Sequence, residues 1–169
     1  IRTPMNGVIG VAQLLRQTPL DRAQIELVVT IEDSGNALLT ILNDILDFSK
    51  IEAGRMEFEH HPFHLRTMVE DSVRLVRPRA EEAGLALEVV VDDEVPAVVA
   101  GDPSRVRQIL LNLASNAVKF TEEGSVRIHV GVDRRDEAAV TLRFEVHDTG
   151  IGIPADRMNR LFQTFSQVD

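Results

Sequence analysis

The sequence predicts an α + α/β fold. A helical hairpin, expected to form a dimeric four-helix bundle, is followed by an α/β sandwich with a mixed sheet and helices on one face. Two observations predict this class. Residues 1–54 show helical periodicity broken by one turn signal, whereas residues 55–169 alternate between helical and strand patterns. Because 169 residues are enough for two small domains, we predict domains at 1–54 and 55–169.

The first region is predicted to form two helices joined by a turn at residues 18–21. We expect Asp21 to cap the second helix, Gly54 to end it, and Pro4 to lie in the first turn of the first helix or to kink it. In the second helix, apolar residues recur at steps of three, four or seven: Leu27, Ile31, Leu38, Ile41, Ile45 and Phe48. A stripe this wide cannot be buried against one short helix, so a second copy of the hairpin is expected to complete the bundle.

The second region is predicted to interleave strands with helices. Strands are expected at 56–63, 86–91, 126–132 and 140–146, and helices at 65–83, 104–120 and 156–165. Gly84 should end the first of these helices, and Asp102 or Ser104 should cap the second, with Pro103 near its start. The last two strands are close in sequence, which favours an antiparallel pair joined by the charged turn 133–137.

Composition excludes several classes of function. With 18 Lys+Arg against 27 Asp+Glu, the net charge is −9, which argues against binding nucleic acid. The absence of Cys excludes disulfides, thiolate metal sites and a Cys nucleophile. No apolar run is long enough to span a bilayer, and no signal peptide precedes the first helix. We therefore expect a cytoplasmic piece of a longer protein, without direct membrane contact of its own.

Two asparagines in the helix predicted at 104–120 are candidate ligands. Asn112 and Asn116 lie four residues apart, so their amides project from one helix face, and Lys119 follows three residues later. Neutral oxygens suit Mg²⁺, and a nearby Lys suits phosphate. The alternative is that both amides cap, bridge or simply face water.

A glycine-containing loop follows the last predicted strand. In the run Asp148-Thr149-Gly150-Ile151-Gly152, the glycines permit positive φ and close backbone approach to a ligand, while Asp148 can accept hydrogen bonds from an amine. The alternative is a plain glycine turn.

Together these motifs resemble a known family. Residues 107–121 resemble the N box of the sensor histidine kinases of two-component systems, 148–154 their first glycine box, and 161–169 their F box. Residues 1–10 are similar to the segment that follows the phosphoacceptor His. The four motifs occur in family order and spacing over nearly the whole chain. Their sequences resemble those of hybrid kinases that carry their own receiver domain.

The resemblance implies that the chain binds ATP with Mg²⁺. It makes Asn116 the Mg²⁺ ligand, with Asn112 as a possible second one, and Lys119 a phosphate contact. Phe120 would flank the adenine, and Asp148 would accept its exocyclic amine.

It also implies that Gly150 and Gly152 shape the pocket and that Ile153 lines it. Phe162 and Phe165 would belong to a mobile lid, or else pack as an ordinary helical pair.

For the hairpin, the resemblance implies dimerisation and phosphotransfer. The phosphoacceptor His would lie two positions before Ile1, and the second glycine box would follow Asp169, so the chain is expected to be truncated at both ends and unable to autophosphorylate alone. Thr3 matches the position that orients water for dephosphorylation of a partner, the alternative being a helix N-cap before Pro4. The chain's own histidines are expected to be ordinary surface or core residues: His60, His61, His64, His129 and His147.

The implied function is ATP-dependent autophosphorylation of a His, followed by phosphorelay to an Asp of a response-regulator receiver domain. The expected partners are a second copy of the chain and that receiver, with residues 50–56 as the hinge between domains. One alternative is a nucleotide-binding dimerisation scaffold without kinase activity. The other is an ATPase of the same fold, but such ATPases carry a catalytic Glu where this chain has Asn112.

Overall fold

The computed structural model describes residues 2–137 and 139–154, so the predicted helix at 156–165 and the F-box residues Phe162 and Phe165 lie outside the described residues. The chain divides into two compact units, Ile1–Glu57 and Phe58–Asp169, which are described separately. Among the residues that the structure describes, none of the helices has the length and apolar character needed to cross a membrane.

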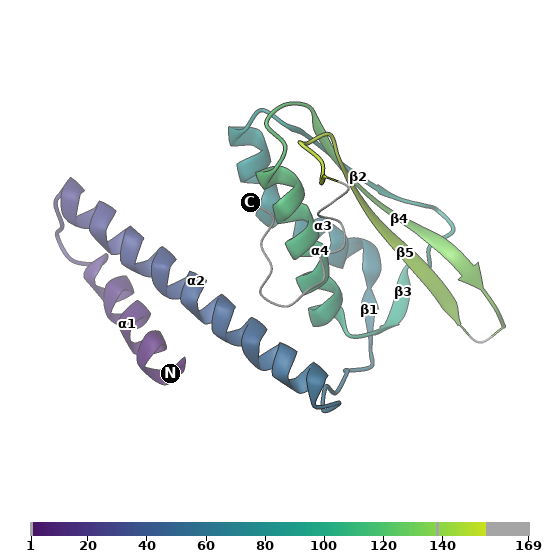
Figure 1. The fold of residues 1–169 in the computed structure, drawn as a ribbon, viewed down its shortest axis with the longest axis horizontal. Helices are drawn as coiled ribbons and strands as arrows, with labels where there is room; N and C mark the ends of the chain where they lie inside the picture. The colour runs from purple at the N-terminus through teal and green to yellow at the C-terminus, as the bar shows by residue number, and fades with distance from the viewer. Residues whose placement is uncertain (1, 138, 155–169) are drawn as a thin grey trace. The chain divides into compact units, whose positions relative to one another are not determined.

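The first unit is a helical hairpin, as predicted, formed by α1 (Arg2–Leu15) and α2 (Arg22–Glu52) (Figure 1). Asp21 caps α2, because its Oδ1 accepts a hydrogen bond from the Gln24 backbone N–H at 2.8 Å and the Gln24 side chain accepts from the Asp21 N–H at 3.0 Å. Beyond the helix, Gly54 has φ of +63°. Pro4 lies in the first turn of α1.

Few residues of the hairpin are buried: Ile9, Ala12, Val28, Glu32 and Gly35. A Cβ on Gly35 would lie 2.7 Å from Cγ1 of Ile9, so the missing side chain permits close approach of the two helices. Most large apolar side chains of the predicted stripe remain exposed, including Leu27, Ile31, Leu38, Ile41, Ile45 and Phe48. The hairpin therefore leaves its apolar stripe largely uncovered within one chain.

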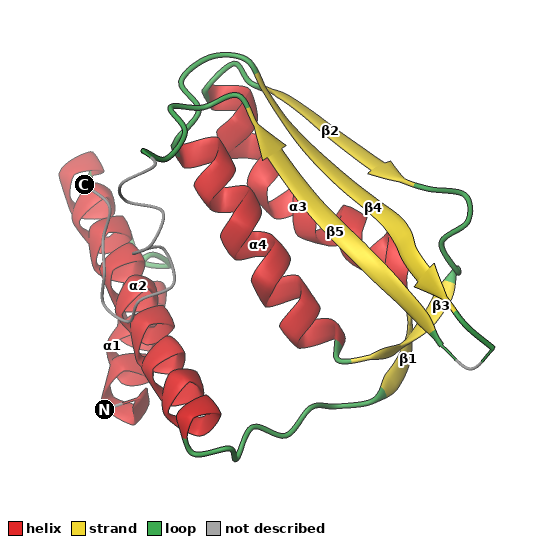
Figure 2. Ribbon diagram, turned by 45° about the vertical axis from the view of Figure 1, so that its right-hand side comes forward, coloured by secondary structure: helices red, strands yellow, loops and turns green. Residues whose placement is uncertain are grey.

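The second unit is an α/β sandwich with a mixed sheet, again as predicted. Its elements are β1 (His61–His64), α3 (Leu65–Glu82), β2 (Ala86–Val91), β3 (Val98–Gly101), α4 (Pro103–Lys119), β4 (Ser125–Arg135) and β5 (Val140–Asp148). In the three-stranded sheet β2-β4-β5, β2 runs parallel and β5 antiparallel to β4, while β1 and β3 form a separate antiparallel pair. Figure 2 shows α3 and α4 covering one face of the larger sheet.

The observed strands differ from the prediction in three places. The strand expected at 56–63 forms only at His61–His64, and β3 was not predicted at all. The strands β1 and β3 pair with each other, although a helix and another strand lie between them in the sequence. Each of these short strands therefore depends on a partner that is distant in the chain. The predicted turn at 133–137 is shorter, because β4 continues past a register shift between Val132 and Arg134.

The core of this unit lies between the helices and the inner face of the sheet. Val126, Ile128 and Val130 of β4 are fully buried there, together with Leu65, Val69 and Val73 of α3 and Leu110, Ala114, Ala117 and Val118 of α4. Asp102 caps α4 through a 3.0 Å hydrogen bond from the Arg105 N–H, with Pro103 as the first helical residue. This backbone hydrogen bond holds the pKa of Asp102 below its ordinary value.

Candidate functional site

The predicted ligand residues of α4 lie on its solvent side. Asn112, Asn116 and Lys119 are exposed, whereas the opposite face of the helix is buried in the core. The amides are therefore available to a ligand. Their neutral oxygens fit Mg²⁺, which keeps several waters and is often bound together with substrate phosphates. In the described ranges 2–137 and 139–154, no group of three or more His, Asp or Glu side chains is placed to hold a metal ion.

The C-terminal end of α4 carries the predicted aromatic residue. The N–H of Phe120 donates to the Asn116 carbonyl at 2.9 Å, and the Phe120 ring is 44% exposed. Nζ of Lys119 lies 4.8 Å from the centre of this ring, within range of a cation–π interaction. The next residue in the chain is Thr121, whose buried hydroxyl donates to the Ala117 carbonyl at 2.7 Å. This hydrogen bond stabilises the last turn of α4.

Asp148 is the last residue of β5 and lies at the same end of the unit as the C-terminus of α4. Inward and outward residues alternate along β5, and Asp148 pairs with the buried Val126, which places it on the α4 side of the sheet. Its Oδ1 accepts a 2.9 Å hydrogen bond from the Gly150 N–H. This hydrogen bond orients the carboxylate at the start of the loop.

The loop after Asp148 is joined directly to the end of α4. The Ile151 N–H donates to the Phe120 carbonyl at 3.2 Å. A Cβ on Gly150 would lie only 2.3 Å from that carbonyl oxygen, so no larger residue fits without movement of the backbone. The structure thus brings Asn116, Phe120 and Asp148 together at one end of the α/β unit.

Two supporting residues were missed by the sequence reasoning. Thr149 Oγ1 accepts from the Ser125 N–H at 3.0 Å, and its own N–H donates to the Ser125 carbonyl at 3.2 Å. Gly124, with φ of +114°, leaves the room that this hydroxyl occupies, since a Cβ there would lie 2.2 Å from Oγ1. The isolated Gly before the β4 pattern was the available signal.

The remaining predicted residues lie on the surface. Gly152 has φ of +66°, and Ile153 is 49% exposed. Thr3 is exposed and is the second residue of α1, so it lies inside the helix and the N-cap alternative is wrong. Four of the five histidines are exposed and His129 is partly buried, so none belongs to the core.

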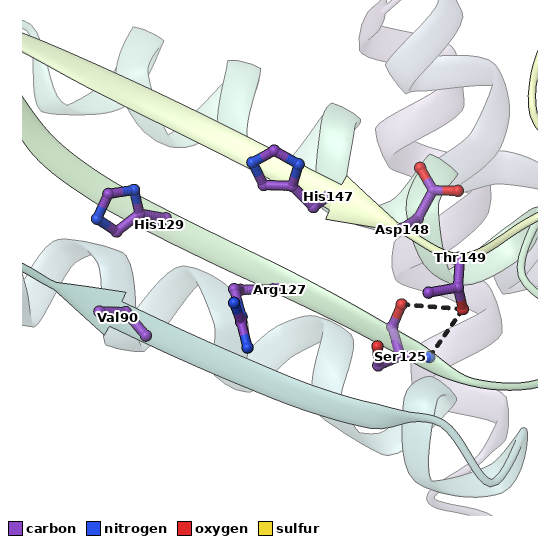
Figure 3. A pocket seen from close by; sticks show the side chains of 7 residues that line it. All are labelled: Val90, Ser125, Arg127, His129, His147, Asp148 and Thr149. Carbon is purple, nitrogen blue, oxygen red and sulfur yellow. Dashed lines mark hydrogen bonds between the residues drawn. The ribbon is translucent and has the colours of Figure 1, made fainter.

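A separate pocket of about 650 Å³ opens on the other face of the sheet (Figure 3). It is lined by Val90, Ser125, Arg127, His129, His147, Asp148 and Thr149. Asp148, as the last residue of β5, lies at the edge of this pocket as well. None of the other predicted ligand residues lines it, because α4 packs against the opposite face. We therefore place the candidate site at the end of α4, where those residues converge, and not in this pocket.

Two family models match the chain. Residues 1–54 match the His Kinase A (phospho-acceptor) domain, and residues 101–169 match the Histidine kinase-, DNA gyrase B-, and HSP90-like ATPase. The first match lies in the hairpin unit, the second in the C-terminal part of the α/β unit, and they follow the order of the motifs. The chain belongs to the histidine kinase family.

Curated relatives of this histidine kinase chain match it over its full length. They include hybrid signal transduction histidine kinase B of Dictyostelium discoideum (45% identical), sensor protein GacS of Pseudomonas syringae pv. syringae (44%) and signal transduction histidine-protein kinase BarA of Escherichia coli K12 (44%). The chain spans only 9%, 19% and 18% of their respective lengths.

Solved histidine kinases share the fold. The structure of full-length ShkA in complex with AMPPNP matches 98% of this chain and 35% of that chain, with a TM-score of 0.78 and 38% identity. The histidine kinase ThkA in complex with response regulator protein TrrA matches 98% of this chain and 48% of that chain, with a TM-score of 0.60. At 21% identity, the second likeness shows the fold alone.

Proposed function

We propose that the chain is the core of a sensor histidine kinase, which binds ATP with Mg²⁺ in its α/β unit and supplies the γ-phosphoryl group to a His of the hairpin domain. The phosphoryl group would then pass to an Asp of a receiver domain. The observation that carries the proposal is the junction between α4 and the Asp148 loop, where the Phe120 carbonyl accepts from the Ile151 N–H at 3.2 Å. It joins the end of the helix with the predicted phosphate-binding residues to the loop after the predicted adenine-binding Asp148.

The residues of this junction have distinct roles in the proposal. Asp148, oriented by the Gly150 N–H, accepts the exocyclic amine of adenine, and the exposed Phe120 ring packs against the base. Lys119, beside that ring, neutralises phosphate charge. Gly152 and Ile153 continue the wall of the pocket beyond Gly150.

Asn112 and Asn116 would hold Mg²⁺ with their amide oxygens. The ion supplies charge neutralisation on the transferring phosphoryl group when bound. The two amides orient that group from one exposed helix face. In the transfer, the bond from the γ-phosphorus to the bridging oxygen breaks, a bond to an imidazole nitrogen forms, and ADP leaves.

The hairpin supplies the dimer and the acceptor in this proposal. Its exposed apolar residues, such as Ile41 at 54% exposure, are covered by a second copy in a four-helix bundle. A receiver domain docks on the same hairpin near Thr3, which orients water for dephosphorylation. ThkA, which shares the fold, was solved with a response regulator. The proposed location of this activity is the cytoplasm, where ATP is available.

Nucleotide binding tests the site. We expect Asp148→Asn to weaken the binding of Mg·ATP at least about tenfold, because the adenine amine loses its charged acceptor. The matched control is Asp93→Asn, at an exposed turn residue outside the site. Equal affinities for wild type and Asp148→Asn, measured by calorimetry, would place the adenine elsewhere.

The metal assignment has its own test. We expect Asn116→Ala to abolish the Mg²⁺ dependence of nucleotide affinity while leaving metal-free binding nearly unchanged. If the affinity of this variant still rises with Mg²⁺ as in wild type, the ion is held by other residues.

Phosphotransfer tests the reaction. A version of the protein that carries the family's acceptor His two positions before Ile1 and its second glycine box after Asp169 is incubated with γ-labelled Mg·ATP. We expect protein-bound label that is lost in acid and survives alkali, which is the behaviour of phosphohistidine. Bound nucleotide without label would support the scaffold, and release of free phosphate would support an ATPase.

A further inference from the structure

The outer face of the sheet, away from the helices, carries a histidine between two carboxylates. Nε2 of His129 on β4 lies 2.9 Å from Oδ1 of Asp92, which follows β2, and Nδ1 lies 3.1 Å from Oε2 of Glu145 on β5. One imidazole thus joins three segments of the unit. The His129 side chain is 32% exposed, so solvent screens these contacts only in part.

The arrangement determines the charge of the ring. A neutral imidazole has one donor and one acceptor nitrogen, whereas an ionised carboxylate only accepts hydrogen bonds. With a carboxylate at each nitrogen, only the imidazolium, with two N–H donors, satisfies both contacts. Loss of one proton turns one of the two hydrogen bonds into a repulsion between a nitrogen lone pair and a carboxylate oxygen.

The two arginines near His129 have carboxylate partners of their own. Facing it on the outer side of the sheet are Arg127 on its own strand, Glu88 and Asp92 from β2 and the turn after it, and Arg143, Glu145 and His147 from β5. Arg127 pairs with Glu88 at 2.6 Å, and Arg143 pairs with Asp133. Each arginine therefore has a carboxylate partner other than Asp92 and Glu145, while the charges of His147 and Arg143 add to the effect of His129 on the pKa of Glu145.

The backbone is shaped around this cluster. A Cβ on Gly131 would lie 2.7 Å from Oδ2 of Asp92 and 3.3 Å from Cε1 of His129. Gly131 is two residues after His129 and lies on the same face of β4. The absence of a side chain there lets the Asp92 carboxylate reach across to the imidazole.

We propose that His129 is a pH-dependent clamp of the α/β unit, which in its protonated form adds side-chain links from β4 to the turn after β2 and to β5, and which loses one of these links when it loses its proton. The hydrogen bonds to Asp92 and Glu145 raise the pKa of His129 above its ordinary value of 6.5. The hydrogen bond to His129 likewise lowers the pKa of Glu145 below 4.5.

The sign of the effect follows from these directions. Because the pKa of His129 is raised in the folded state, the stabilisation is fully present below pH 6.5 and is lost as the pH rises through the folded-state pKa. The pKa of Glu145 is lowered in the folded state, so its stabilisation is fully present above pH 4.5. This stabilisation is lost as the pH falls through the folded-state pKa of Glu145. The clamp therefore holds from mildly acidic pH up to the pH at which His129 deprotonates.

The first test is an NMR titration of the histidines in the 169-residue chain. We expect the His129 ring to carry protons on both nitrogens at pH 6.5 and to titrate above that value. Asp92→Asn should lower this pKa, because one of the two carboxylates becomes neutral. Titration of wild-type His129 at or below its ordinary pKa would overturn the proposal without need of any variant.

The second test is thermal unfolding of the same chain between about pH 6 and pH 9, followed by circular dichroism. Relative to His129→Gln, wild type should lose at least about 2 °C of Tm across this range. The matched control is His60→Gln, at an exposed histidine before β1 and outside the cluster, which should keep the wild-type profile. A Tm difference between wild type and His129→Gln that does not change with pH would contradict the clamp. Neither test involves nucleotide.

Discussion

The hairpin and the α/β unit bury their apolar residues in opposite ways. Among the described residues of the hairpin, 2–57, three apolar side chains are buried, Ile9, Ala12 and Val28, while much of the α2 stripe faces solvent. In the part of the α/β unit that the structure describes, fifteen buried residues form one core between the helices and the sheet. The difference shows that the α/β unit builds a core within one chain, whereas the hairpin needs a second surface to cover its stripe.

An isoleucine in each region provides the sharpest contrast. Ile128 is fully buried, so Ile128→Ala should destabilise the α/β unit by about 3–4 kcal/mol. Ile41 is 54% exposed in one chain, so Ile41→Ala should leave the α/β unit unchanged and weaken dimerisation. Chemical unfolding followed by circular dichroism measures the first effect, and analytical ultracentrifugation the second. Equal dimer affinity for wild type and Ile41→Ala would remove this residue from the proposed interface.

Each unit also has a glycine that lies against a neighbouring residue, and the two glycines should respond differently to substitution. Gly150 faces the Phe120 carbonyl, which belongs to the backbone at the end of α4 and cannot rotate away. We expect Gly150→Ala to displace the loop, to cost about 2–3 kcal/mol and to weaken nucleotide binding. Denaturation and nucleotide titration of the same variant measure both effects. Wild-type affinity in this variant would show that the loop position does not matter for the ligand.

In the hairpin, the corresponding contact is with a side chain. Gly35 faces Ile9, whose side chain can change rotamer, so Gly35→Ala should cost only about 1 kcal/mol. Gly7→Ala in α1 is the matched control, since a Cβ there has no neighbour within 4 Å. This control should stabilise the helix by up to about 1 kcal/mol. If both variants are stabilised to the same extent, the close approach at Gly35 is unimportant.

The smallest expected effect concerns a helix cap. Asp21→Ala removes the side-chain acceptor of the capping box of α2 and should cost about 1 kcal/mol, confined to the hairpin. Hydrogen exchange of the first turn of α2 measures this loss directly. Asp21→Asn, which keeps an acceptor oxygen, should recover most of it, and an equal loss in both variants would contradict the capping role.

Local signals in the sequence were sufficient for most of the fold. Asp21, Gly84 and Asp102 mark helix ends through their own hydrogen bonds or dihedral angles, so their roles could be predicted without a partner. The strand at Ala86–Val91 was predicted at its observed bounds, because its β-branched run is bounded by Gly84. By contrast, β3 was missed because a strand of four residues exists only through its pairing with β1.

The site was predicted only in part, because local signals identify single residues but not contacts between distant ones. Asn112, Asn116 and Asp148 could be selected from residue type and spacing, and their roles in binding remain proposals. Thr149 and Gly124 were not selected. Their importance lies in a contact between them, because the Thr149 hydroxyl occupies the space that a side chain at Gly124 would fill. Sequence spacing contains no information on such a contact.

By itself, the sequence determined the family, the division into helical and α/β regions, and the ends of most helices, since these depend on periodicity, caps and motifs along the chain. Only the tertiary structure decided which strands pair, that Gly150 meets the Phe120 carbonyl, and that His129 lies between Asp92 and Glu145. These are contacts between residues distant in sequence, and their geometry is set by the packing of the sheet and not by local preference.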